Sequence, residues 1–101
     1  FPQGPPTLEV CIIIMIFYVY MLICVSGDKL FSYVGYTNNL KKRLNLHNTS
    51  RGAKYTKGRN WTIIYKKKYY SKSKAMKEEY KLKKNYYLRN MIKKDYLEKH
   101  A

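Results

Sequence analysis

The longest apolar stretch of the chain begins at Val10, and short apolar runs then alternate with basic polar ones. Residues 10–25 carry no charge, and every position from Phe17 to Val25 is apolar or aromatic. A strand that is apolar on both faces belongs at the centre of a sheet. Ser26 to Lys29 then supply turn chemistry, and Leu30 to Val34 are strand-like again. The two runs therefore predict a β-hairpin whose second strand ends at Gly35.

A short amphipathic helix is predicted next. Thr37 to Asn39 offer side-chain oxygens for an N-cap, and the segment from Leu40 to Asn48 repeats its apolar residues with helical spacing. Arg43 and His47 share the face of the leucines. We therefore expect these two polar side chains to point toward the core.

The second half of the pattern predicts a loop, a third strand and helices. Residues 50–60 form a basic loop, and residues 61–70 suit a strand whose Lys66–Lys68 run indicates a sheet edge. A long helix begins at about Ser73, with Glu79 in the middle of its apolar face and Glu78 on the flank. That face consists of Ala75, Met76, Tyr80, Leu82, Tyr86 and Tyr87. A short final helix is expected over residues 90–101.

Size and charge narrow the function. The chain has 101 residues, and 21 Lys and Arg against 6 Asp and Glu give a net charge of +15. This is one small domain, which excludes a multidomain enzyme. Such a charge favours a polyanion as partner, with nucleic acid first, because neutralised phosphates release counterions. A solvated lysine surface and an anionic membrane surface are the two alternatives.

The cysteines and the first residues carry less information. Cys11 and Cys24 lie in apolar runs without CxxC spacing, which argues against a disulfide framework or a zinc site and indicates an intracellular, reducing compartment. The run from Val10 to Val25 is shorter than the roughly 20 residues of a membrane-spanning helix, so a span is not expected. Residues 1–16 are predicted to be a leader or linker, and residues 17–101 the functional domain.

Two tyrosines, an arginine and a histidine are predicted to converge. With the turn near Gly27, Tyr20 and Tyr33 lie within one or two positions of being cross-strand partners, and Arg43 and His47 face the same core. Each also has a purely structural interpretation: the tyrosines and the histidine as packing residues, the arginine as a side chain that extends to solvent. Few carboxylates are available to Arg43, so a phosphate is favoured as its partner.

Glu79 is the candidate metal ligand. A pair with Lys83 one turn later would make it an ordinary helix interaction, worth a few tenths of a kcal/mol. A carboxylate centred on an apolar face carries a larger desolvation cost, which a divalent cation offsets better. One carboxylate with several waters suits a single Mg²⁺ or Mn²⁺ ion. The absence of a second acidic cluster argues against a two-metal site.

The order and spacing of these residues resemble the GIY-YIG nucleases. The matching strings are Tyr18-Val19-Tyr20, Tyr33-Val34-Gly35, Asn39 to Leu44, His47-Asn48, Gly52 to Thr56 and Ala75 to Lys83. The last two strings look most like the small stand-alone bacterial branch, which is related to structure-specific endonucleases and to the cutting domain of bacterial excision repair. The resemblance covers roughly Phe17 to Leu88.

The resemblance implies a mixed α/β fold of the α+β class, in which helices flank a three-stranded antiparallel sheet. It also implies phosphodiester hydrolysis with one divalent metal ion. The implied catalytic residues are Tyr20, Tyr33, Arg43, His47 and Glu79. One of the tyrosines helps to deprotonate the attacking water, Arg43 stabilises the scissile phosphate, His47 lies near that phosphate, and Glu79 holds the metal. Because a free phenol has a pKa near 10, we expect the surrounding cations to lower the pKa of that tyrosine.

Other positions extend or depart from the family pattern. The cations predicted to bind nucleic acid are Lys41, Lys42, Arg51, Lys54, Lys57 and Lys83. Tyr55 matches a tyrosine of the stand-alone branch without an assigned role. Tyr18 replaces the first signature's glycine, and Tyr36 stands where several members have lysine.

The predicted function is that of a metal-dependent endonuclease acting on nucleic acid, DNA in the first place, in a repair, recombination or mobile-element setting. The first alternative is a non-catalytic basic module that binds nucleic acid by stacking and charge. The second is a membrane-associated basic protein that uses residues 10–25 as an anchor.

Overall fold

A three-stranded antiparallel sheet forms the middle of the molecule. The computed structural model describes residues 15–100. The strands are β1 (Phe17–Ser26), β2 (Lys29–Thr37) and β3 (Thr62–Tyr69), in the spatial order β2-β1-β3. The hairpin, the central position of β1 and the edge position of β3 confirm the predictions from the apolar pattern. The predicted end of the second strand at Gly35 is wrong, because pairing continues to Thr37 opposite Tyr18.

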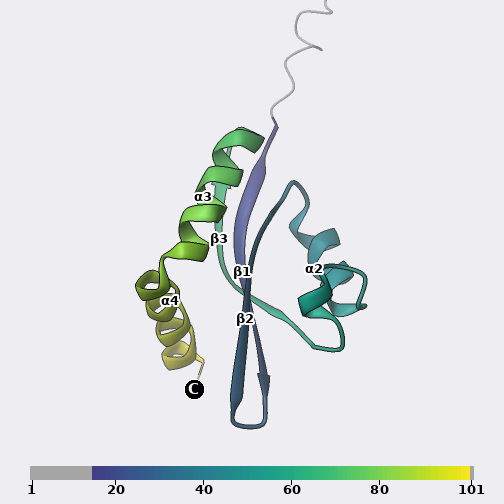
Figure 1. Cartoon of the computed structure of the whole chain (residues 1–101), viewed down its shortest axis with the longest axis vertical. Coiled ribbons are helices and arrows are strands. Elements are labelled where there is room, and N and C mark those ends of the chain that lie inside the picture. The colour runs from purple at the N-terminus through teal and green to yellow at the C-terminus, as the bar shows by residue number, and fades with distance from the viewer. Residues whose placement is uncertain (1–14, 101) are drawn as a thin grey trace, which may run out of the picture.

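Helices cover the two faces of this sheet (Figure 1). Helix α2 (Leu40–Asn48) lies on one side, and helices α3 (Lys72–Lys84) and α4 (Tyr86–Lys99) lie on the other. This arrangement confirms the α+β class. Because side chains alternate along a strand, β1 contributes to two separate cores. Val19 and Met21 pack toward α3, whereas Tyr20 and Leu22 pack toward α2.

Helix α2 begins and ends as its sequence predicts. The Asn39 side chain caps it by accepting a hydrogen bond from the backbone N–H of Lys42 at 3.1 Å. The following loop contains a single 3₁₀ turn, η1 (Lys54–Thr56), where the sequence predicted only loop. Trp61, predicted as the start of the third strand, precedes β3 and is buried.

The C-terminal helices differ from the prediction. Asn85 ends α3, where its N–H bonds the Leu82 carbonyl, and its side chain caps α4 by accepting from the N–H of Leu88. Helix α4 is therefore 14 residues long, and it includes Tyr86 and Tyr87, which were assigned to the preceding helix. The apolar face predicted for α3 was also too broad. Ala75 and Leu82 are buried, but Met76, Tyr80, Tyr86 and Tyr87 are exposed.

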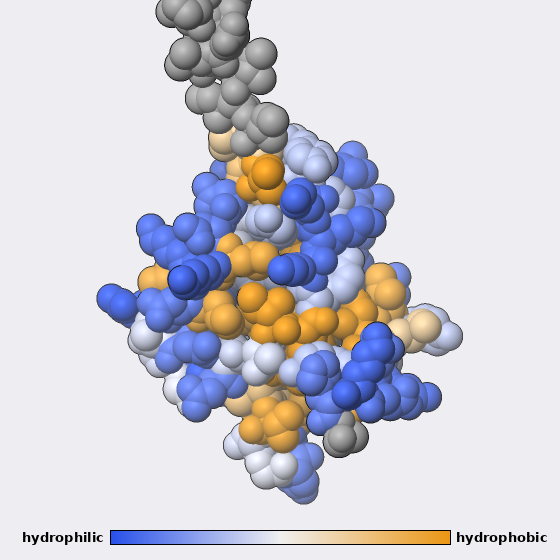
Figure 2. All heavy atoms as spheres, turned by 180° about the vertical axis from the view of Figure 1, so that it is seen from behind, coloured by the Kyte–Doolittle hydropathy of each residue, from blue (hydrophilic) through white to orange (hydrophobic). Residues whose placement is uncertain are grey.

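The predicted leader falls almost wholly outside the described residues, as does Cys11. Cys24 is a free, buried thiol. The second half of the run from Val10 to Val25 is strand β1, and none of the helices in residues 15–100 has the length and apolar composition needed to cross a bilayer. Figure 2 shows the molecule from behind, where hydrophilic side chains surround a central band of hydrophobic ones.

Candidate active site

Tyr20 lies on the central strand and is packed between the sheet and α2. Strand pairing sets it opposite Gly35. Its phenol ring lies directly against that glycine, since a Cβ atom at position 35 would come within 2.7 Å of Tyr20 Cζ. Only glycine leaves room for the ring. The glycine of the Tyr33-Val34-Gly35 string is thus required by the position of Tyr20.

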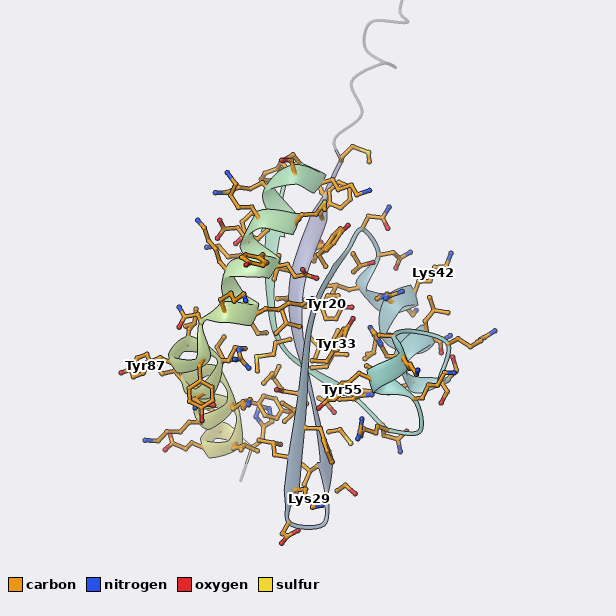
Figure 3. All side chains as sticks on the ribbon, viewed as in Figure 1. Tyr20, Lys29, Tyr33, Lys42, Tyr55 and Tyr87 are labelled. Carbon is orange, nitrogen blue, oxygen red and sulfur yellow. The ribbon has the colours of Figure 1, made fainter. Side chains whose placement is uncertain are left out.

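Tyr33 joins Tyr20 on the same face of the sheet. It pairs with Leu22, two residues beyond Tyr20, and its ring centroid lies 6.5 Å from that of Tyr20. The ring centroid of His47 is 5.0 Å from that of Tyr33. The expected approach of the two tyrosines is confirmed, and Figure 3 shows both rings on the side of the sheet that α2 covers.

His47 is fully buried and uses both ring nitrogens. Nε2 lies 2.9 Å from the hydroxyl of Tyr20, and Nδ1 lies 2.9 Å from Oγ1 of Thr56, which is also fully buried. The Thr56 hydroxyl donates to the carbonyl oxygen of Ala53 at 2.8 Å. His47 therefore has no free nitrogen for a phosphate, and any effect it has on a substrate must pass through Tyr20.

The Ala53 carbonyl fixes the direction of this hydrogen-bond chain. A carbonyl oxygen can only accept a hydrogen bond, so the Thr56 hydroxyl donates its hydrogen to the Ala53 carbonyl. The Thr56 oxygen must therefore accept a hydrogen bond from His47 Nδ1–H. Nε2 is then the unprotonated nitrogen of the imidazole. Consequently Tyr20 donates its phenolic hydrogen to His47, and the free lone pair of its oxygen faces away from the histidine.

The electrostatics of the pair follow from its burial. Burial, with a smaller contribution from the charge of Arg43, lowers the pKa of His47 to about 4. Burial also raises the pKa of Tyr20 to about 12, although a hydrogen bond and the charge of Arg43 act in the opposite direction. The expectation that nearby cations lower the pKa of the tyrosine is wrong for Tyr20, because desolvation outweighs them. At neutral pH the phenol is protonated and the imidazole is neutral.

Arg43 lies beside the two phenols. It projects from α2 one turn before His47, and the phenol oxygens of Tyr20 and Tyr33 both raise the pKa of its guanidinium. Its Nε atom is buried, and no described residue accepts a hydrogen bond from it. None of the ion pairs in residues 15–100 involves Arg43. An unpaired guanidinium nitrogen beside two phenols is suited to an anionic oxygen.

Glu79 and Glu78 are neighbours on α3 but influence different tyrosines. Burial is the main cause of the raised pKa values of Tyr20 and of Tyr65 and Tyr69 on β3. The negative charge of Glu79 adds a smaller effect at Tyr20, and that of Glu78 adds one at the two β3 tyrosines. Of these two carboxylates, only Glu79 has an electrostatic effect on Tyr20. Its side chain is 17% exposed and pairs with Lys83 at 3.5 Å, so the ordinary helix pair considered from the sequence is present.

A known protein family matches most of the chain. The family model described as the GIY-YIG catalytic domain matches residues 16–92. The chain belongs to the GIY-YIG family. That match spans both tyrosine strings, α2 and the Glu79 helix, so the whole site lies within it. Membership in this family implies nuclease activity.

The relatives of this GIY-YIG chain are small bacterial proteins. A UPF0213 protein of Oceanobacillus iheyensis is 51% identical over 67 residues, which cover 65% of this chain and 74% of the relative. A UPF0213 protein of Staphylococcus haemolyticus is 42% identical over 67 residues, which cover 65% of this chain and 78% of the relative. A UPF0213 protein of Bacillus pumilus is 43% identical over 67 residues, which cover 65% of this chain and 65% of the relative. These names give no specific function. No solved structure matches the chain significantly.

The donor set of this GIY-YIG site fits one hard cation. No group of three His, Cys, Asp or Glu side chains that could hold a metal ion occurs in residues 15–100, so Glu79 would have to act as a single carboxylate ligand. Its one partner among the described ion pairs, Lys83, is half exposed and can turn to solvent. A single carboxylate completed by water is a usual environment for Mg²⁺.

The predicted nucleic-acid-binding cations are all exposed. Lys41, Lys42, Arg51, Lys54 and Lys57 belong to α2 and the loop that follows it, on the site's side of the sheet. Lys83 is on α3 and is engaged with Glu79. The structure thus brings five of the six to the α2 side.

The sequence reasoning missed the residues that hold His47 in place. Gly52 lies against the imidazole, because a Cβ there would come within 3.0 Å of His47 Cε1. Trp61 is buried, and its indole N–H donates to the Thr56 carbonyl at 3.0 Å. In the sequence, the string from Gly52 to Thr56 carries only a resemblance to the family. Its spacing gave no signal that Thr56 would return to a histidine nine residues earlier.

Proposed function

We propose that this GIY-YIG domain is a metal-dependent endonuclease that hydrolyses phosphodiester bonds in DNA. The observation that carries the proposal is the hydrogen bond from Tyr20 to His47 beside the unpaired Nε of Arg43. In this arrangement the Tyr20–His47 pair can accept a proton from water, and the Arg43 guanidinium can bind the phosphate. The other catalytic roles are assigned to Tyr33 and Glu79.

Tyr20 is suited to relay a proton. Since its pKa is about 12, it does not act as a preformed tyrosinate at neutral pH. The attacking water gives a proton to the phenol oxygen while the phenolic proton passes to His47 Nε2. The water oxygen bonds to phosphorus as the bond to the leaving oxygen breaks, and the leaving oxygen keeps that electron pair until it gains a proton from solvent. His47 then returns its proton to the Tyr20 oxygen, which releases the proton taken from water to solvent, so that both groups are restored. The negative charge that develops on the phosphate favours the imidazolium and so offsets the low pKa of His47.

Arg43 and Tyr33 act on the phosphate itself. The Arg43 guanidinium offers a buried donor and a positive charge to the oxygens on which charge develops. Tyr33, adjacent to both Tyr20 and His47, can donate its hydroxyl to the same phosphate or water. A divalent cation such as Mg²⁺ or Mn²⁺, held by Glu79, would supply Lewis-acid stabilisation of the phosphate and leaving oxygens.

DNA as the substrate, and repair or recombination as the setting, rest on the resemblance to structure-specific endonucleases. A charge of +15 suits either nucleic acid. The six predicted cations, from Lys41 to Lys83, would contact the backbone on either side of the cut.

The test is a cleavage assay with labelled duplex, flap and single-stranded DNA and with RNA of the same sequences. Each is incubated with Mg²⁺, with Mn²⁺ and with chelator. We expect strand scission of DNA with either cation and none with chelator. Cleavage of RNA alone would overturn the choice of DNA. Binding without scission under all conditions would favour the non-catalytic basic module.

A further inference from the structure

An aromatic and cationic group lies next to Tyr33 on the α2 side of the sheet. The rings of Tyr33 and Tyr55 are nearly parallel, at an interplanar angle of 20°, with centroids 6.3 Å apart. That centroid separation is larger than in a face-to-face stack, so the two rings lie side by side and offset from each other. The Arg59 guanidinium carbon lies 4.9 Å from the Tyr55 centroid and 4.1 Å from that of Phe31.

This group is held by contacts within the fold and is partly open to solvent. Arg59 Nη1 donates a hydrogen bond to the Tyr55 carbonyl, which holds the guanidinium over the ring. Tyr55 also contacts buried Trp61, with ring centroids 6.2 Å apart. Nevertheless Tyr55 is 49% exposed. An aromatic ring that is fixed on one side and half exposed presents a preformed surface for a flat ligand.

The surroundings select a polyanion. No Asp or Glu occurs anywhere between Asp28 and Glu78, and Lys54 and Lys57 flank Tyr55 in the exposed loop. Figure 3 shows Tyr20, Tyr33 and Tyr55 following one another along the α2 side of the sheet. The exposed ring thus continues the row of phenols at which the phosphate is cleaved.

We propose that Tyr55, with Arg59 and Phe31, is a subsite that stacks one unpaired nucleobase next to the scissile phosphate. This inference rests on the proposed function only for the position of the cut. Bases stack on aromatic rings and on guanidinium planes in single-strand complexes. In a continuous duplex both faces of a base are already covered by its neighbours. The subsite therefore assigns to this domain DNA with an unpaired nucleotide at the cut, such as a flap, a bubble or a frayed end.

The first experiment measures binding in chelator, so it does not depend on cleavage. The ligands are a short oligothymidine and the same backbone with abasic sites throughout. Tyr55→Ala should weaken binding of oligothymidine about tenfold and binding of the abasic strand less than twofold. Tyr55→Phe should bind both as the unchanged protein does, because stacking needs the ring and not the hydroxyl.

Two controls separate stacking from loop damage. Tyr55→Leu keeps an apolar side chain against Trp61 but has no flat ring, so it should behave like Tyr55→Ala. Tyr87→Ala removes a tyrosine that is 75% exposed on α4 and should have no effect. If Tyr55→Leu binds normally, or if Tyr55→Ala weakens the two ligands equally, the subsite is overturned. If Tyr55→Phe loses as much affinity as Tyr55→Ala, the hydroxyl is the functional group and stacking is wrong.

The second experiment locates the subsite relative to the cut. In a flap substrate, a single abasic site is moved one nucleotide at a time through the unpaired arm. The cleavage defect of Tyr55→Ala, about tenfold to a hundredfold in kcat/KM, should disappear only when the abasic site is adjacent to the cut. An equal defect on continuous duplex contradicts the proposal. If no substrate is cleaved but the binding results hold, the stacking subsite stands and the proposed nuclease function fails.

Discussion

The ring of Tyr20 lies against the backbone of Gly35, its partner across the β1–β2 pair, so that the two residues fit only in this combination. The close approach sets the phenol oxygen 2.9 Å from His47 Nε2. A second glycine has the same relation to the histidine, since Gly52 leaves the space that the imidazole fills. Both ends of the Tyr20–His47 hydrogen bond are therefore positioned by the absence of a side chain.

Gly35→Ala should lower the cleavage rate strongly while the sheet remains folded. The added methyl group must displace the Tyr20 ring, because Tyr20 Cζ would otherwise lie 2.7 Å from it. We expect a loss of about a hundredfold or more in kcat, the usual consequence of misplacing a catalytic group by about 1 Å. Ser32→Ala, at a position of β2 on the opposite face of the sheet from Gly35, is the control. A Gly35→Ala variant that cuts at the normal rate would show that the position of Tyr20 is not critical.

The stability of the protein should fall as the pH is lowered from 7 to 5. The pKa of His47 is about 4 in the folded protein and near 6.5 when unfolded, so the unfolded chain binds more protons in this range. Protonation therefore favours unfolding, and stability rises with pH. The expected change in the free energy of unfolding is about 2 kcal/mol between pH 7 and pH 5, measured by urea denaturation.

His100→Gln is the control for this pH dependence, because His100 is exposed at the end of α4. It should leave the dependence unchanged. Direct titration of the His47 ring by NMR provides the decisive number. A midpoint near 6.5 would mean that His47 is solvated, and the hydrogen-bond chain to Thr56 would then be wrong.

Glu79→Gln should abolish metal-dependent cleavage, whereas Glu78→Gln should retain it. The charge of Glu79 acts on Tyr20, and the charge of Glu78 acts on tyrosines of β3. The neighbouring carboxylates have similar side-chain exposure, 17% and 22%, so each controls for the other. The measurements are the cleavage rate against Mg²⁺ concentration and the melting temperature. An inactive Glu78 variant with an active Glu79 variant would reverse the assignment of the metal ligand.

Arg43→Ala should reduce the rate about 10²- to 10³-fold, the effect of losing one preorganised donor in the transition state. Affinity should change little, since many lysines remain. Arg43→Lys should recover only part of the rate, because an ammonium lacks the planar fork of a guanidinium. Lys94→Ala, exposed on α4, removes the same charge far from the site. An equal fall in affinity and rate would make Arg43 a binding residue.

The sequence predicted the elements whose pattern is local. The apolar run of β1, the turn at Gly27 and the Asn39 cap each act through neighbouring residues, so the hairpin and α2 were predicted correctly. The break at Asn85 was missed because no glycine or proline marks it and lysines and tyrosines continue on both sides. The exposure of Tyr80 could not be predicted either, since helical spacing defines a face but not the width that the sheet covers.

The candidate site divides in the same way. Tyr20, Tyr33, Arg43 and His47 could be brought together from strand register and helix periodicity. The partners of His47 could not, because Thr56 reaches it through an irregular loop closed by Trp61 and Asn48. The pKa of Tyr20 was predicted in the wrong direction for a related reason. Charge can be counted in a sequence, whereas the depth of burial that dominates this pKa depends on how α2 covers the sheet.

Binding to DNA should depend strongly on salt and weakly on sequence. With four to six phosphates contacted, the slope of log affinity against log salt should be roughly −4 to −5. Strand β3 offers a matched pair for testing this. Lys66 is paired with Tyr20 and shares the α2 face, while Lys67 is paired with Val19 and shares the opposite face.

Lys66→Gln should therefore make the salt slope about one unit shallower, and Lys67→Gln should leave it nearly unchanged. Fluorescence anisotropy with random-sequence duplex from low to moderate salt measures both slopes. The opposite result would place the DNA against α3, where Lys74 and Lys81 are already paired with Glu78. A slope near −1, or a thousandfold preference for one sequence, would show that the lysines mainly solvate the surface. Recognition would then depend on contacts to base edges, for which this row of phenols and cations offers few groups.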